Sequence, residues 1–301
     1  MNKHFIGHLQ VVLATFLIAG SFIASADISQ ELHPISLNLM RFFIAALVLA
    51  PFIVLKKNAL KQLKNVLPRS MVISFFYCSY FACVFAAMLT TTTLNVGSIY
   101  TLTPLITALL SIIIFKQSFA FKTLVIYLLG VVGTLWAIFG GSFERFLMLN
   151  LNQGDLIISG GVLCMAGYTI SMKALYRQDD VTIMTFANLL CGIIWMSIAA
   201  SIGDISLEWH LLESRYYPSM VYLAIAATFL TSYLYQKAST VLQPVNVASY
   251  IYLNPLCVAL LSMIILKEHV DSILWWGISA SAIATLILQR INQPNNSITT
   301  D

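Results

Sequence analysis

A single basic residue, Arg41, lies inside an apolar run that is long enough to cross a bilayer, 35–55. A formal charge at that depth costs on the order of 2–3 kcal/mol unless it faces a cavity or a partner. Arg41 therefore either lines a binding site or reaches the interface and pairs with Asp27 or Glu31. Alignment of Pro34–Arg41 with Val181–Asn188 places Asn188 opposite Arg41, so this position is polar in both halves.

Two prolines occupy equivalent places near the middle of two apolar runs. Pro104 and Pro255 each displace the carbonyl four residues earlier, at Tyr100 and Ile251. One such proline is often only a packing kink. A break at the same place in both halves of a chain is instead the sequence sign of a transporter's binding site.

Polar side chains surround the two prolines at helical spacing, and phenols lie inside two further runs. The polar residues are Tyr100, Thr103, Thr107 and Ser111 in the first copy and Tyr252, Asn254 and Ser262 in the second. Tyr80 and Tyr168 lie in mid-run, where a buried phenol needs a hydrogen-bond partner. Most tyrosines of membrane proteins are interfacial anchors, which is the alternative interpretation of these two.

Residues for bond-making chemistry are missing from the pattern. No HExxH, GxSxG or Walker-type glycine loop occurs, and no Asp or Glu lies in the interior of an apolar run, since Asp27, Asp155 and Glu268 lie at the ends of runs. All five cysteines lie inside apolar runs without metal-ligand spacing. We therefore expect no enzyme activity, no metal, no cofactor and no disulfide, and proton exchange through a buried carboxylate has no candidate residue.

The segment that positions the prolines is duplicated. Residues 95–117 and 246–268 align without a gap and are identical at 13 of 23 positions. The whole chain is 59% hydrophobic and 9% charged, with a mean hydropathy of +0.86, which indicates a polytopic membrane protein. The net charge of +4 is therefore not a sign of a nucleic-acid partner.

Apolar runs of about 20 residues predict ten helices. They are expected at 6–26, 35–55, 70–90, 95–115, 123–140, 154–173, 182–201, 218–237, 245–266 and 273–290. The sequence Ala24-Ser25-Ala26 imitates a signal-peptide cleavage site. The apolar run before this site is longer than a typical signal-peptide core, and its segment starting at Gly20 has a counterpart starting at Gly167 in the second half. We therefore expect a first helix that is not cleaved off.

The distribution of Lys and Arg predicts the orientation. With a cytoplasmic N-terminus, the inside segments hold 12 of these residues and the outside loops hold three. Five spans per half then make the duplication inverted. We thus expect an all-α integral membrane protein whose ten transmembrane helices form an inverted 5+5 structural repeat, with a site between the halves.

Four features together resemble the drug/metabolite transporter superfamily, in its EamA-type branch. They are the inverted five-plus-five plan, Gly20-Ser21 in the first helix, Arg41-Phe42 in the second, and the Leu-x-Pro-Leu segments Leu102–Leu105 and Leu253–Leu256. Relatives follow the fourth and ninth helices with a glutamate. Here Glu268 matches, whereas the first half has Gln117.

The resemblance implies two EamA-like repeats, 1–141 and 153–292, followed by a polar tail, 293–301. It implies a secondary transporter of a bacterial inner (plasma) membrane that exports amino acids or other small polar metabolites, with both termini cytoplasmic. The expected partners are a small-molecule substrate and the lipid bilayer. A membrane-embedded helper or sensor without transport activity is the alternative.

Small residues along one predicted helix indicate close packing. Gly130, Gly133, Ala137 and Gly140 fall on 123–140. Such a row brings helix backbones together either within one bundle or between two protomers. A homodimer is the second of these arrangements.

Overall fold

The fold was analysed in a computed structural model that describes residues 3–28, 31–91, 93–116, 121–139, 141–147, 152–267 and 269–291. All regular structure in these ranges is helical. The first half contains α1 (Lys3–Ile28), α2 (Pro34–Val54), α3 (Ala59–Met88), α4 (Thr93–Tyr100), α5 (Thr103–Phe115) and α6 (Phe121–Ile138). The short α7 (Phe143–Leu147) follows.

The second half repeats this plan with more interruptions. It contains α8 (Gln153–Leu175), α9 (Val181–Ile202), the continuous stack α10 (Tyr217–Val221), η3 (Tyr222–Leu230) and α11 (Thr231–Ser239), the segmented span α12 (Pro244–Ser249), η4 (Tyr250–Leu253), α13 (Asn254–Leu261) and η5 (Ser262–Leu266), and α14 (Leu274–Ile291). The loop helices η1 (Trp209–Leu211) and η2 (Ser214–Tyr216) precede α10.

The predicted ten-helix fold is confirmed. Nine spans of the described residues are long and apolar enough to cross a membrane, and the tenth predicted span is present as α4 and α5. Large apolar side chains such as Leu47, Ile113 and Leu286 are exposed on the outside of the bundle. They are where lipid would cover the protein, since lipid tails solvate such side chains.

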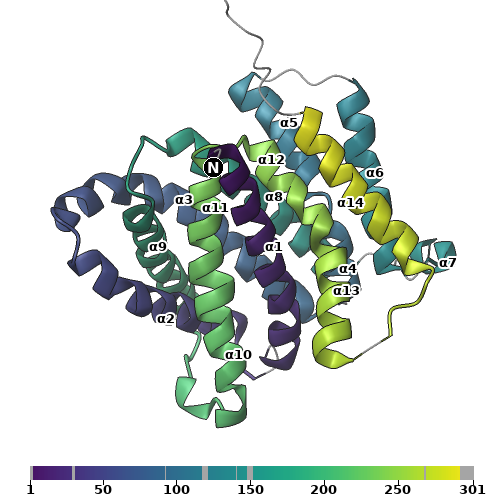
Figure 1. Ribbon diagram of the computed structural model, residues 1–301. Coiled ribbons are helices and arrows are strands. Elements are labelled where there is room, and N and C mark those ends of the chain that lie inside the picture. Colours follow the sequence, from purple (N-terminus) through teal and green to yellow (C-terminus); the bar gives the residue numbers. More distant parts are fainter. Residues whose placement is uncertain are drawn as a thin grey trace, which may run out of the picture.

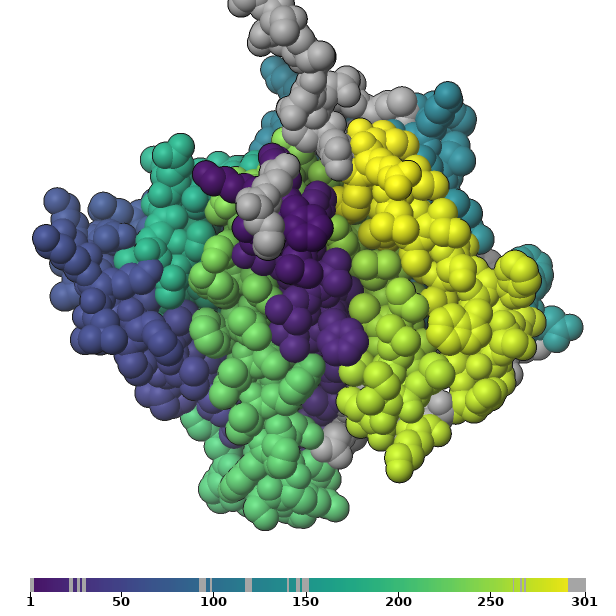
Figure 2. Space-filling view, in the orientation of Figure 1, coloured from purple at the N-terminus to yellow at the C-terminus, as the bar shows by residue number. Residues whose placement is uncertain are grey.

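Packing between the halves follows a pseudo-two-fold pattern. The contact of α3 with α8 corresponds to that of α11 with α1, and the contact of α5 with α8 corresponds to that of α13 with α1. The pairs α2–α9 and α6–α14 join equivalent helices (Figure 1). Figure 2 shows α1, in purple, held between α11 and α13 of the other half. The molecule is thus assembled from contacts between its halves.

Both prolines break their spans at the predicted places. Pro104 lies in the first turn of α5, and the Tyr100 carbonyl accepts a 2.7 Å hydrogen bond from the Thr103 hydroxyl. Before Pro255, the 3₁₀ turn η4 ends with the Asn254 N–H donating to the Ile251 carbonyl. Each freed carbonyl is therefore satisfied locally, as the apolar surroundings require.

The prediction for the third helix was wrong at its start. This helix was expected at 70–90, but α3 begins at Ala59 and contains Pro68 in its interior. Residues 59–67 pair buried Ala59 and Val66 with exposed lysines. A hydropathy run marks where a helix enters the membrane, so it missed this amphipathic extension beyond the bilayer.

The glycines of α6 pack within the chain. A Cβ at Gly133 would lie 2.9 Å from the Gly277 carbonyl oxygen of α14, and one at Gly130 would meet the Tyr252 ring at 2.5 Å. Only glycine admits these approaches, because any side chain would displace the neighbouring helix. Gly140, like Gln117 and Glu268, lies outside the described residues.

Candidate functional site

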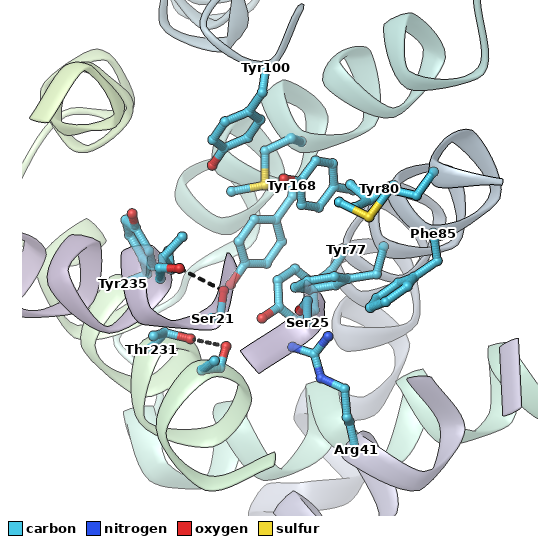
Figure 3. Close-up of a pocket in the computed structure, with 16 residues that line it drawn as sticks. Ser21, Ser25, Arg41, Tyr77, Tyr80, Phe85, Tyr100, Tyr168, Thr231 and Tyr235 are labelled. Carbon is cyan, nitrogen blue, oxygen red and sulfur yellow. Dashed lines mark hydrogen bonds between the residues drawn. The ribbon is translucent and has the colours of Figure 1, made fainter. Parts of the chain in front are cut away.

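A cavity of about 60 Å³ lies between the two halves (Figure 3). At roughly 10–15 Å³ per water, it has room for about four water molecules. Its walls come from α1, α2, α3 and α4 of the first half and from α8, η3 and α11 of the second. The lining residues are Ile18, Ser21, Ser25, Arg41, Tyr77, Tyr80, Phe81, Val84, Phe85, Met88, Tyr100, Met165, Tyr168, Ala227, Thr231 and Tyr235.

Arg41 carries the one formal charge among these lining residues. It lies seven residues after the start of α2, about 10 Å along the axis at 1.5 Å per residue, and is only 2% exposed. Its Cζ lies 4.7 Å from the centre of the Phe81 ring, a cation–π contact. The cation is thus held deep in the bundle by an aromatic face.

Thr228 holds one side of the Arg41 guanidinium. Its hydroxyl accepts from Nε at 3.2 Å and from Nη2 at 3.0 Å, and it donates to the Leu223 carbonyl at 2.7 Å. That last bond spans five residues, as in the π-helix η3 that contains Thr228. Single π-helical turns within α-helices are frequent at functional sites.

Neither predicted acidic partner of Arg41 is seen to pair with it. Glu31 instead accepts a 2.7 Å hydrogen bond from the Tyr216 hydroxyl, and the side chain of Asp27 lies outside the described residues. The guanidinium also contacts Asn38, whose Oδ1 lies 3.5 Å from Nη1. Figure 3 shows both terminal nitrogens pointing toward the tyrosines. Of the two interpretations of Arg41, the geometry favours the cavity.

Tyrosines form the opposite wall as two stacked pairs. Tyr77 and Tyr168 stack at 4.6 Å between ring centres, and Tyr80 and Tyr100 at 5.6 Å. Tyr77 and Tyr80 lie on α3, whereas their partners Tyr168 and Tyr100 lie on α8 and α4. Each pair therefore joins two helices. The Tyr77 hydroxyl also accepts from Ser232 of α11 at 3.1 Å. This wall therefore crosses the boundary between the halves.

Four of the eight predicted binding residues meet at this cavity, namely Arg41, Tyr80, Tyr100 and Tyr168. The other four lie elsewhere: Thr103, Asn188 and Tyr252 are buried and Asn254 is half-buried. Thr103 caps the Tyr100 carbonyl, and Tyr252 donates to the Tyr127 carbonyl at 3.1 Å while packing on α6. Asn188 on α9 and Oδ1 of Asn254 are buried without a hydrogen-bond partner among the described residues.

The sequence pattern missed several members of the wall. Tyr77 precedes Tyr80 by three residues and lies on the same face of α3, so helical spacing could have found it. Tyr235, Ser21 and Thr231 carry no such signal. Their helices contain polar residues on several faces, and only the packing of α1 against α11 selects one.

A second, smaller cavity of about 10 Å³ lies beside the first. Met165, Tyr168 and Tyr235 line both cavities, and we call these three shared residues the constriction. The larger cavity extends to Met88, the last residue of α3, whereas the smaller extends to Ser239, the last residue of α11. The two cavities thus follow one line across the bundle.

Ion pairs join the halves at the Ser239 end of this line. Arg69 binds Asp179 through both terminal nitrogens, at 2.5 and 2.9 Å, and Lys56 reaches Asp180 at 2.5 Å. The Arg69 guanidinium hydrogen bond holds the pKa of Asp179 below its ordinary value. We name these two pairs the ionic clamp.

The opposite end of the line is held by hydrogen bonds from neutral donors. Besides the Tyr216–Glu31 bond, the indole of Trp209 donates to the Ser36 hydroxyl at 3.0 Å, and Ser36 donates to the Leu207 carbonyl. The α1–α2 and α8–α9 connections occupy equivalent places in the two halves. The same connection is therefore tied by formal ion pairs at one end and by neutral donors at the other.

An inverted ten-span bundle with a cavity between its halves defines a multi-pass membrane transporter rather than an enzyme. The EamA-like transporter family model matches the chain twice, over residues 5–139 and 152–290. The chain belongs to the EamA-like transporter family.

Relatives share this description without a substrate. An uncharacterized transporter of Archaeoglobus fulgidus is 24% identical over 265 residues, covering 88% of this chain and 90% of the relative. The uncharacterized transporter YetK of Bacillus subtilis is 26% identical over 274 residues, covering 88% and 82%. A solved crystal structure, described only as that of a protein, has a TM-score of 0.75 at 14% identity and covers 97% of this chain and 98% of its own. That likeness supports the fold alone.

Proposed function

We propose that this membrane transporter exports small metabolites, amino acids among them, by alternating access. The observation that carries the proposal is the Arg41 cavity, which is enclosed by helices of both halves. A site built this way opens to one side when the halves rock apart at one end and closes when they meet. The cavity is small, so its walls must separate before a metabolite can enter.

The two ends of the cavity line supply the two gates. With the N-terminus in the cytoplasm, the ionic clamp lies on the cytoplasmic side and the Glu31–Tyr216 bond lies on the outside. Export then requires the clamp to break so that substrate reaches the Met165–Tyr168–Tyr235 constriction from within. The excess of Lys and Arg on that side supports this orientation, which we assign to a bacterial plasma membrane.

Flux measurement in liposomes tests the proposal. Purified protein should move labelled amino acids or similar metabolites down a gradient, and Arg41→Gln should impair this flux. Lys57→Gln, which removes an exposed charge outside the cavity, is the control and should leave it intact. Absence of flux and of binding across a broad metabolite panel would favour the non-transporting helper instead.

We take the single chain as the transporting unit. Both repeats needed to enclose the cavity lie in one chain. A homodimer would have to use a face other than the glycine row of α6, because Gly130 and Gly133 pack against helices of their own chain.

A further inference from the structure

We propose that the cavity selects small molecules that carry one carboxylate on an apolar or aromatic body, with the carboxylate on Arg41. This inference rests on the proposed transport function and names the substrate class of that site. It follows from how the guanidinium is used, from the charge of the lining and from the chemistry of the walls.

One edge of the Arg41 guanidinium is hydrogen-bonded by Thr228, whereas N–H donors at its end remain open. Thr228 binds the edge formed by Nε and Nη2. Five N–H donors are available in an arginine, and three are used by acceptors in the described residues, one of them at the long distance of 3.5 Å. The end formed by Nη1 and Nη2 points into the cavity (Figure 3). That end is the planar fork that a carboxylate fills with two parallel hydrogen bonds.

The charge of the lining sets the charge of the ligand. Among the described residues that line the cavity, Arg41 is the one charged group and none is acidic. One carboxylate neutralises this cation. A second carboxylate, or a phosphate dianion, would enter a low-dielectric site without a further cation and would keep its desolvation cost.

An ammonium group alone would be repelled by Arg41. An ammonium on a zwitterion can instead sit against the ring faces of Tyr77 and Tyr80, which attract cations through their π-electrons. These rings lie on the wall toward which Arg41 points. The site therefore accepts a monoanion or a zwitterion and excludes a simple amine.

The remaining walls fit an apolar body. Phe81, Val84, Phe85, Met88 and Met165 line the cavity beside the tyrosines. Aromatic and thioether side chains pack against rings and branched alkyl groups, and methionine adapts to several shapes. A polar or hydroxylated body placed against these five side chains would lose hydration without gaining hydrogen bonds from them.

Calorimetric binding of two matched ligand sets to the purified full chain tests this inference. The first set shares a phenyl ring and consists of phenylalanine, 3-phenylpropionate, phenylalaninamide, phenethylamine, phenylsuccinate and phenyl phosphate. Leucine and leucinamide form the isobutyl set. We expect the two zwitterions and 3-phenylpropionate to bind about 10- to 100-fold more tightly than the amides and the amine, the range for a charge-assisted hydrogen bond.

Substitution of Arg41 should remove the preference for carboxylates over amides. In Arg41→Gln, phenylalanine and phenylalaninamide should bind within about twofold of each other, and in Arg41→Lys part of the preference should remain. Lys57→Gln should behave as the wild type. The wild-type panel decides on its own if Arg41→Gln fails to fold.

Three outcomes would overturn the inference: equal or stronger binding of the amides, the phosphate or the dianion; a carboxylate preference that persists in Arg41→Gln; or no binding in either set. Flux of amines or neutral metabolites in liposomes would leave the transport proposal standing while this inference fails. Loss of all flux across a broad panel would instead remove the transport proposal itself.

Discussion

The contact between Arg41 and Thr228 holds a cation from the first half against a hydroxyl from the second. The hydroxyl serves three groups at once, since it accepts from two guanidinium nitrogens and donates to the Leu223 carbonyl. Removing it would leave a buried cation with fewer partners. Buried polar groups lose the most when one partner is deleted and the other remains.

Thr228→Val should therefore lower both stability and flux. We expect a loss of about 1–3 kcal/mol in unfolding free energy, the usual cost of an unsatisfied buried group. Thermal melting in detergent and liposome flux would measure it. Thr228→Ser keeps the hydroxyl and should stay close to wild type, so equal losses in both variants would contradict this role.

The broken spans α4–α5 and α12–α13 are the elements that depart most from regular helix. Each break leaves its last carbonyl satisfied nearby, by the Thr103 hydroxyl or by the Asn254 N–H. The break therefore costs little in the resting structure. It also leaves a point at which each span can bend, because the continuous i→i−4 hydrogen-bond ladder is missing there.

Pro104→Ala and Pro255→Ala should slow transport without destabilising the fold. Alanine restores the backbone donor and favours a continuous helix, so each variant should lose about tenfold in flux, or about 1.4 kcal/mol in the barrier. Pro51→Ala is the matched control, because Pro51 lies inside α2 away from either break. Equal effects of all three substitutions would rule out a special role of the breaks.

The connection between α8 and α9 is the element that carries the ionic clamp. Asp179 is bound by Arg69, and Asp180 accepts from the N–H groups of Thr182 and Ile183 at the start of α9 while also meeting Lys56. The connection is therefore fixed both to its own helix and to the opposite half.

Lowering the pH should release Asp179 from this clamp. Since the folded pKa of Asp179 is depressed, its stabilisation is fully present above the ordinary aspartate value of 3.8 and is lost as the pH falls through the lower folded value. The melting temperature should fall over this window in the wild type. At neutral pH, Asp179→Asn should melt at a lower temperature, because its free energy of unfolding should be lower by on the order of 1 kcal/mol. Its melting temperature should also fall less than that of the wild type as the pH is lowered. An equal pH response in both proteins would contradict the assignment.

At the scale of the whole molecule, two sets of contacts hold together the halves that meet at the cavity. They are the ionic clamp at one end and the Tyr216–Glu31 and Trp209–Ser36 hydrogen bonds at the other. The structure has the clamp formed, and the cavity extends toward the other face. Alternating access predicts that weakening the clamp exposes the smaller cavity from the clamp side.

Asp179→Asn combined with Asp180→Asn should make Ser239 more accessible. A cysteine introduced as Ser239→Cys lines the smaller cavity and should react faster with a hydrophilic thiol reagent when the clamp is neutralised. The same cysteine in the otherwise unchanged chain is the reference, and Glu31→Gln at the far face should not raise its rate. A rate unchanged by clamp removal would argue against this gate.

Much of this architecture followed from the sequence because it was repeated there. The duplicated segments and the loop charges predicted the inverted fold, and the paired prolines predicted both breaks. Arg41 stood out as one charge in an apolar run. Tyr77 and Tyr235 did not, because hydropathy tells that a helix is buried but not which neighbour each face meets. Thr103 and Tyr252 were misplaced for the same reason, since their polar atoms satisfy backbone carbonyls outside the cavity.

The equivalent positions of Arg41 and Asn188 have an energetic consequence. Two identical inverted halves would exchange roles when the molecule changes the side to which it opens, so its two end states would be degenerate. Arg41 is a cation bound to Thr228, whereas Asn188 is a neutral amide, so the two end states differ in free energy. Every 1.4 kcal/mol of difference is about a tenfold bias in occupancy. The difference of one charge between Arg41 and Asn188 is thus one source of the bias in the resting side of the transporter.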